Sequence, residues 1–313
     1  MNRVKVAICV ITYRRPEGLK RLLSGLDKLT FAKCRPHPIV EVIVVDNDPS
    51  GAARELCKEI GATYRWPLQY YNEPRRGIAY ARNKAVACVT AGTDFVGFID
   101  DDEVPEVSWL DELLDVQQSY GADVVSGPVL PHFIGSVPDW ILKGKFFEPR
   151  RYPTGHPLTL SYTGNVLVRS EVFDKMRRLF DERYAMTGGE DFLFFMRVYH
   201  AGYKIVWADE ALVYEWVPES RANARWILQR AYSGANQFIR VELNFRTLRM
   251  VAIVRSMTAS IRIVQGLLLV ALSLALGRHA LIKGLQYMSR GAGMLIGLTG
   301  MRYEQYRRKI HGT

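Results

Sequence analysis

Three short runs of apolar, mostly β-branched residues dominate the first hundred positions, and a helical pattern follows each of them. The runs cover residues 4–12, 40–45 and 95–99. An apolar run with almost no polar interruption suits a strand that is buried on both faces. Strands of this type that alternate with helices predict an open, mostly parallel α/β sheet. In such a sheet, ligands bind beyond the carboxyl ends of the strands.

The same periodicities predict the remaining elements. We expect helices at residues 16–29, 52–60, 77–90, 109–120 and 189–202, and further strands at 64–71, 123–126, 164–169 and 203–207. Residues 127–157 contain six prolines and are typical of a long loop. From about residue 222 the pattern is helical to the end of the chain.

Acidic clusters directly follow two of the buried runs. The first is Asp-Asn-Asp at residues 46–48, and the second is Asp-Asp-Asp-Glu at residues 100–103. Adjacent carboxylates repel one another, and a divalent cation with a preference for oxygen ligands, Mg²⁺ or Mn²⁺, would relieve that repulsion. Alternate residues project to one side, so Asp100 and Asp102 are expected to face one site. A solvated acidic turn is the alternative for each cluster when it is taken alone, and it is as good an explanation only for residues 46–48.

A further acidic pair begins the helix expected at 189–202. Two glycines precede Glu190 and Asp191, and glycine lets a backbone approach a ligand closely. The helix dipole also favours carboxylates at this position, so the pair could serve only as N-terminal helix residues.

Seven sequence blocks together resemble glycosyltransferase family 2, whose members are inverting enzymes with the nucleotide-sugar fold called GT-A. In chain order they are VAICVITYRRPEGL, VIVVDND, GIAYARNKAV, FVGFIDDDEVP, TGNVLVRSEVF, LFDERYAMTGGEDFLFFMRVYHAGYKIVW and ALVYEW. The resemblance extends over roughly residues 4–230, about three quarters of the chain. The details are most similar to bacterial enzymes that extend lipid-linked exopolysaccharide repeats of the succinoglycan type.

The resemblance implies a donor site at the strand ends. The residues that would bind the nucleotide sugar are Thr12, Tyr13, Arg14, Asp46, Arg82, Asp100 and Asp101. Asp46 would lie on the uracil or ribose side, Arg82 near the base or diphosphate, and Asp100 at the ribose.

The resemblance also implies a metal ligand and a catalytic base. Asp102 would hold a Mn²⁺ or Mg²⁺ ion that bridges the diphosphate, and Asp191 would be the general base with Glu190 beside it. Many relatives carry a metal-binding His where this chain has Glu215, so either Glu215 or a water is expected to complete the metal shell.

The implied reaction is an inverting, metal-dependent transfer of one sugar, with UDP-glucose as the expected donor and a lipid-linked oligosaccharide as the acceptor. Processive relatives carry a QxxRW motif, whereas here Ala222 precedes Arg225 and Trp226 at the Gln position. We therefore expect addition of a single sugar. The alternative is a non-catalytic membrane scaffold that has kept the fold.

Charge divides the chain at its last quarter. The formal net charge is +10, and residues 241–313 hold 11 basic but only two acidic residues. The rest is nearly neutral, which argues against a nucleic-acid-binding body. We expect a glycosyltransferase domain at residues 1–235 and a basic, apolar helical region at 236–313. The four cysteines show no metal or disulfide spacing, as in a reducing compartment.

The apolar tail predicts membrane association. Residues 263–276 would form a helix of about 21 Å, too short to cross a bilayer core of about 30 Å. Residues 281–301 are apolar but contain Lys283 and Arg290. We expect a helical hairpin or interfacial helices embedded in one leaflet, on the cytoplasmic face of the inner membrane. Packing of this segment against the catalytic body is the alternative.

Overall fold

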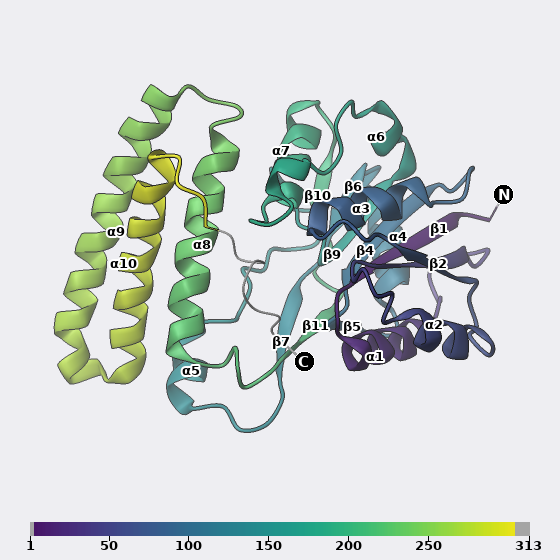
Figure 1. The fold of residues 1–313 in the computed structure, drawn as a ribbon, viewed down its shortest axis with the longest axis horizontal. Helices are drawn as coiled ribbons and strands as arrows, with labels where there is room; N and C mark the ends of the chain where they lie inside the picture. Colours follow the sequence, from purple (N-terminus) through teal and green to yellow (C-terminus); the bar gives the residue numbers. More distant parts are fainter. Residues whose placement is uncertain (1–2, 304–313) are drawn as a thin grey trace.

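The computed structural model describes residues 3–303. Its central element is an eight-stranded sheet (Figure 1). Its order is β3-β2-β1-β4-β9-β6-β10-β8. The strands are Lys5–Thr12 (β1), Ile39–Asp46 (β2), Leu68–Asn72 (β3), Phe95–Asp100 (β4), Val124–Ser126 (β6), Pro157–Leu158 (β8), Asn165–Arg169 (β9) and Ile205–Trp207 (β10). Neighbouring strands pair in parallel except at β9 and β8, so the expected mostly parallel α/β sheet is confirmed.

Helices cover both faces of this sheet. Alternate β1 residues point to opposite sides, so that Ile8 packs in one core and Cys9 in the other. One face carries Pro16–Asp27 (α1), Arg54–Gly61 (α2) and Trp109–Tyr120 (α4). The other carries Ile78–Ala87 (α3), Ser170–Lys175 (α6) and Glu190–His200 (α7), with a 3₁₀ turn at Glu182–Tyr184 (η1). Burial on both sides explains why β1, β2 and β4 read as continuous apolar runs.

A second, three-stranded sheet corrects the expected long loop at 127–157. Its order is β5-β11-β7, with bounds Glu103–Pro105, Val213–Val217 and Val129–Phe133. A short helix, Asp139–Gly144 (α5), follows β7. β7 pairs only with β11 and is therefore an edge strand, where proline is tolerated because one side needs no hydrogen bonds. Pro131 gave this strand the sequence signature of a loop.

Three long helices form the C-terminal part of the described chain. They are Ala224–Glu242 (α8), Leu248–Leu276 (α9) and Arg278–Leu298 (α10), which run side by side next to the catalytic body (Figure 1). α9 and α10 make the expected hairpin, and the expected domain boundary at 235/236 falls inside α8. The end of the helical pattern, beyond residue 303, lies outside the described residues.

The length expected for the apolar helix was wrong. The apolar stretch 263–276 belongs to the 29-residue helix α9, which is about 44 Å long at 1.5 Å per residue. Among residues 3–303, α9 is the one helix long and apolar enough to cross a membrane, as judged by length and composition. The sequence pattern did not reveal the full length of this helix, because a charged residue interrupts the apolar run every six or seven positions, at Arg249, Arg255 and Arg262.

α10 is held tightly between its two neighbours. A Cβ added at Gly284 would lie 2.7 Å from a backbone oxygen of α9, and one added at Gly293 would lie 2.3 Å from the carbonyl oxygen of Tyr232 on α8. Only glycine permits such approaches, because any side chain would collide with backbone. The three helices therefore form one packed unit rather than a loosely tethered tail.

A close approach of α1 to the acidic residues after β4 gives a test of this architecture. A Cβ at Gly18 would lie 2.5 Å from the carbonyl oxygen of Asp101. We expect Gly18→Ala to lower the free energy of unfolding by about 1–3 kcal/mol, the usual cost of overpacking.

Gly234→Ala is the control, since Gly234 lies in α8 with open space around its Cα. This change should raise stability by up to about 1 kcal/mol through helix propensity. Thermal unfolding of both variants decides the point, and equal shifts would contradict it.

Candidate active site

A cavity of about 530 Å³ opens beyond the carboxyl ends of β1 and β4, which is where the sequence predicts a ligand site. One wall is built from the turn after β1 and from the loop that precedes α3. The other wall comes from α7, β11 and α8. Of the predicted site residues, those lining the cavity are Thr12, Tyr13, Asp100, Asp101, Asp102, Asp191 and Glu215. Elements from across the whole catalytic body thus converge on one space.

The turn after β1 is strained in a way that shapes the cavity. Arg14 has a φ of 55°, in the left-handed region that non-glycine residues rarely adopt. Just before this turn, the Thr12 hydroxyl donates to Asp101 Oδ2 at 2.9 Å. The Arg14 side chain points elsewhere and pairs with Asp48 at 2.7 Å. Arg14 therefore does not line the cavity.

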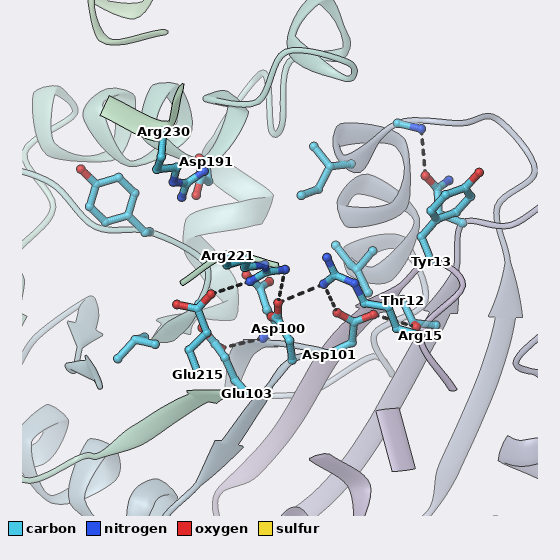
Figure 2. Close-up of a pocket in the computed structure, with 18 of the residues that line it drawn as sticks. Thr12, Tyr13, Arg15, Asp100, Asp101, Glu103, Asp191, Glu215, Arg221 and Arg230 are labelled. Atoms are coloured by element: carbon cyan, nitrogen blue, oxygen red, sulfur yellow. Dashed lines mark hydrogen bonds and ion pairs between the residues drawn. The ribbon is translucent and has the colours of Figure 1, made fainter. Parts of the chain in front are cut away.

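Two arginines hold the acidic residues after β4 from opposite sides. Arg15 Nη1 lies 2.9 Å from Asp101 Oδ1 and 3.1 Å from Asp102 Oδ2. From the other side, Arg221 Nη2 lies 2.8 Å from Asp102 Oδ2, and its Nη1 lies 2.7 Å from Glu215 Oε1. Figure 2 shows the two guanidinium groups reaching the acidic cluster from these directions. Both arginines therefore contact the same oxygen of Asp102, Oδ2.

Burial and mutual repulsion disfavour the charged forms of two acids that line the cavity. Burial raises the pKa of Asp101 to about 6, against the opposing charge of Arg15. Burial and the charges of Asp100 and Asp102 raise the pKa of Glu103 well above its usual range. Glu103 Oε2 accepts the backbone N–H of Asp100 at 2.8 Å, which fixes the start of the acidic turn.

The acidic pair on α7 splits into one open and one buried carboxylate. Asp191 lines the cavity, and its Oδ2 has only long contacts of 3.4–3.5 Å with Thr163. Glu190 is fully buried and pairs with Arg82. The preceding Gly188 and Gly189 have φ of 75° and 92°, so their role in the structure is to form the tight turn into the helix. Asp191 is the carboxylate that a substrate can reach.

Arg82 and Asp46 lie beneath the cavity rather than on its surface. Arg82 is buried on α3 between Glu190 and Asp100, whose Oδ1 lies 3.5 Å from Nη2. Asp46 ends β2 and accepts the backbone N–H groups of Asp48 and Ala53, each at 2.9 Å. This geometry matches the turn-forming role that the sequence left open for residues 46–48.

Several cavity residues were not singled out from the sequence. They are Arg15, Asn47, Arg76, Phe146, Phe147, Tyr162 and Arg230. Asn47 carried a signal, because it belongs to the acidic cluster after β2. The aromatic residues carried none, since Phe146 and Phe147 lie in the segment that was expected to be a loop. Figure 2 shows Arg230 beside Asp191, on the side of the cavity formed by α8.

The donor set suits a hard divalent cation, although residues 3–303 bring no three His, Cys, Asp or Glu side chains together around a point. Mg²⁺ and similar ions commonly bind through one or two carboxylates plus substrate phosphates. Asp102 and Glu215 meet this requirement, since both face the cavity and Arg221 already bridges them. A cation site with two carboxylates fits these residues.

This fold, with an acidic strand end and a helix-borne aspartate on one cavity, defines a glycosyltransferase of the GT-A type. The family model of glycosyl transferase family 2 matches residues 7–177, and that of glycosyl transferase family group 2 matches residues 95–299. The chain therefore belongs to glycosyltransferase family 2. The expected family, fold and enzyme class are confirmed.

Individual relatives agree with this assignment. The succinoglycan biosynthesis protein ExoM of Rhizobium meliloti is 34% identical over 228 residues, which are 72% of each chain. The pre-mycofactocin glycosyltransferase of Mycobacterium tuberculosis is 28% identical over 74% of this chain, but that match spans only 46% of the relative.

Two solved structures share the fold. S. aureus TarS 1–349 in complex with UDP has a TM-score of 0.54 at 18% identity, covering 99% of this chain and 95% of that one. The mannosyltransferase PcManGT of Pyrobaculum calidifontis, in complex with GDP-Man and Mn²⁺, has a TM-score of 0.61 at 17% identity, covering 94% and 88%.

The buried Glu190 predicts a pH dependence of stability. Burial raises its pKa from 4.5 to about 7, although Arg82 opposes the shift. The native state keeps this proton when the unfolded chain has already lost it. Glu190 therefore stabilises the fold below pH 4.5, and that contribution, up to about 3 kcal/mol, is lost as the pH rises to 7. Glu190→Gln should flatten the decline in stability between pH 5 and 7.5, measured by thermal unfolding.

The control is Glu171→Gln. Glu171 is exposed and its pKa is lowered by Lys175, so it does not titrate in that window and the wild-type decline should persist. An identical decline in wild type and Glu190→Gln would contradict the prediction.

Proposed function

We propose that the chain transfers a single sugar, with inversion, from a nucleotide sugar to a lipid-linked oligosaccharide in exopolysaccharide or cell-surface glycan synthesis. One observation supports this most directly. In a family 2 chain, the accessible carboxylate Asp191 and the acidic residues after β4 face one cavity from opposite walls. The similarity to a succinoglycan biosynthesis protein supports the exopolysaccharide pathway.

The donor occupies the wall formed by β1 and β4. Thr12, Tyr13 and Asp100 line this part of the cavity, beside Asn47 and Arg76. UDP-glucose is the proposed donor, and the complexes of structural neighbours with UDP and with GDP-Man support a nucleotide sugar. Asp102 and Glu215 would hold Mn²⁺ or Mg²⁺, which offsets negative charge on the departing diphosphate. Arg82, Arg14 and Asp46 act indirectly, by fixing the acids and turns around the donor.

Asp191 is the proposed general base. An acceptor hydroxyl must lose its proton as it attacks the anomeric carbon, and a carboxylate within hydrogen-bond reach accepts it in the transition state. The long contacts of Asp191 leave its Oδ2 available for that hydrogen bond. A single in-line displacement turns an α-linked donor into a β-glycoside. Glu190 stays buried against Arg82 and orients the start of α7.

The opposite wall suits the acceptor. Phe147 and Trp226 stack at 5.3 Å between ring centroids, and Tyr162 lines the same cavity. Aromatic faces offer apolar surface on which sugar rings can lie. This wall belongs to α8 and the segment after α5, next to the apolar hairpin. A lipid-linked acceptor would therefore approach from the side of the C-terminal helices.

The C-terminal hairpin is the proposed membrane contact, at the cytoplasmic face of the inner membrane. Twelve large apolar side chains of α9 are exposed, and most lie on one face at spacings of three or four residues. α8 lies in the same packed unit but lines the cavity with Trp226 and Arg230, so it cannot enter the bilayer core. These facts favour α9 lying in one leaflet over α9 crossing the membrane.

The central test is Asp191→Asn. We expect loss of at least about a hundredfold in sugar transfer, the usual range for removing a general base. UDP binding should change little, because the Asn side chain keeps the shape of the site. The measurements are a screen of nucleotide sugars for Mn²⁺-dependent hydrolysis and calorimetry with UDP. Near-normal turnover of the best donor by Asp191→Asn would rule out the assigned base.

The membrane contact is tested on the full chain. Leu268 and Leu272 are 60% and 55% exposed on the outer face of α9. Changing both to Glu should weaken binding to phosphatidylglycerol-containing vesicles about tenfold or more, since each buried leucine contributes roughly 1.5–3 kcal/mol. The double variant Val107→Glu and Tyr199→Glu, on exposed positions of the body, is the control. Equal cosedimentation of both double variants would contradict the proposal.

A further inference from the structure

Arg221 binds the two carboxylates that are expected to hold the cation. Its Nη2 and Nη1 lie 2.8 Å from Asp102 Oδ2 and 2.7 Å from Glu215 Oε1. These carboxylates come from different elements, since one follows β4 and the other lies on β11. A planar guanidinium with two parallel donors is well suited to join them. The side chain is only 9% exposed, so this is a built contact and not a surface ion pair.

The link that carries Arg221 is short and defined. Residues 218–223 connect β11 to α8, and the Arg221 N–H donates to the carbonyl of Pro218 at 2.9 Å. The next turn begins α8, whose side chains form the acceptor wall. Arg221 therefore lies at the junction between the donor and acceptor sides of the cavity.

A guanidinium and a divalent cation compete for the same oxygens. Asp102 Oδ2 already accepts a hydrogen bond from Arg15 and forms an ion pair with Arg221, and Glu215 Oε1 accepts a hydrogen bond from Arg221. A hard cation takes carboxylate oxygens as ligands, and two positive centres cannot share the same oxygens at contact distance without strong repulsion. Cation binding through these oxygens of Asp102 and Glu215 therefore requires Arg221 to leave them.

We propose that Arg221 holds the place of the cation in the nucleotide-free enzyme and makes cation binding depend on the donor nucleotide. The inference rests on the proposed function of this site. Without nucleotide, expelling Arg221 would take a guanidinium that is only 9% exposed away from the carboxylates of Asp102 and Glu215, which is costly. The donor diphosphate supplies another anion for it, because it accepts the bidentate donors of an arginine well. Cation and nucleotide then bind cooperatively, and Arg221 is the residue that couples them.

Arg15 has a different part in this arrangement. Its Nη1 is shared between Asp101 and Asp102, and Asp101 is also fixed by Thr12. Arg15 can keep Asp101 when Asp102 turns to the cation, so it anchors the cluster. Arg221 instead pairs with Asp102 and Glu215, the two carboxylates that would hold the cation. The exchange therefore falls to Arg221.

The experiment measures Mn²⁺ binding to the full chain by the loss of the free-ion paramagnetic resonance signal, with and without saturating UDP. In wild type we expect UDP to tighten Mn²⁺ binding by about tenfold or more, within the usual range of coupling between sites. Arg221→Gln should tighten Mn²⁺ binding in the absence of UDP by about the same factor and so reduce the effect of UDP. If Arg221 served only to hold the local structure, Arg221→Gln would not tighten Mn²⁺ binding.

Matched variants complete the design. Arg225→Gln removes an exposed arginine from the first turn of α8 and should leave Mn²⁺ binding unchanged. Asp102→Asn should weaken it both with and without UDP. Arg221→Lys keeps the charge but lacks the two-pronged geometry, so its coupling should fall between wild type and Arg221→Gln. The Lys variant serves as the test if the Gln variant does not fold.

The outcomes separate the two levels of proposal. One outcome is that Arg221→Gln and Arg221→Lys bind Mn²⁺ without UDP no more tightly than wild type, while Asp102→Asn no longer binds Mn²⁺. The proposed role of Arg221 is then wrong, and the proposed donor site stands. If wild type binds no Mn²⁺ even with UDP, the exchange is overturned as well. Mn²⁺-dependent hydrolysis of any nucleotide sugar then decides whether the proposed function fails with it.

Discussion

The structure depends on how its crowded carboxylates are held at the carboxyl edge of the sheet. Asp101, Asp102 and Glu215 meet there at the cavity, with Glu190 buried below. Three arginines from different elements pair with these four carboxylates, and Asp102 and Glu215 share one of them. Arg15 belongs to the turn before α1, Arg82 to α3 and Arg221 to the link before α8. These ion pairs join the sheet, both helical layers and the C-terminal unit. The carboxylates at this edge suit a cation, and the arginines beside them suit an anionic donor.

The sequence predicted the part of this arrangement that rests on local pattern. β1, β2 and β4 were readable because both of their faces are buried, and the acidic turns were readable because they end those strands. The arginine partners were not, since a residue such as Arg15 lies 86 positions from Asp101 and nothing local marks the pair. The small sheet was missed for a different reason. Its strands are three to five residues long, and Pro131 in β7 has the local signature of a loop.

Glu190 and Asp191 illustrate the limit of motif reasoning. The sequence treats two adjacent acids at a helix start as equivalent, and the resemblance placed both in the catalytic group. Helix geometry turns neighbouring side chains about 100° apart, so one meets the cavity and the other meets Arg82 in the interior. Chemistry that needs contact with substrate is therefore open to Asp191 alone, while Glu190 fixes the surroundings.

The tight packing of α10 between α9 and α8 bears on how far the enzyme can reach. Because glycine contacts lock the three helices together, no flexible tether separates the apolar face of α9 from the wall that carries Trp226 and Arg230. With that face in a bilayer, the reaction centre would sit at a constant height above the lipid surface. An acceptor would then have to carry its growing end at that height, so the helices would act as a ruler that selects glycans by length.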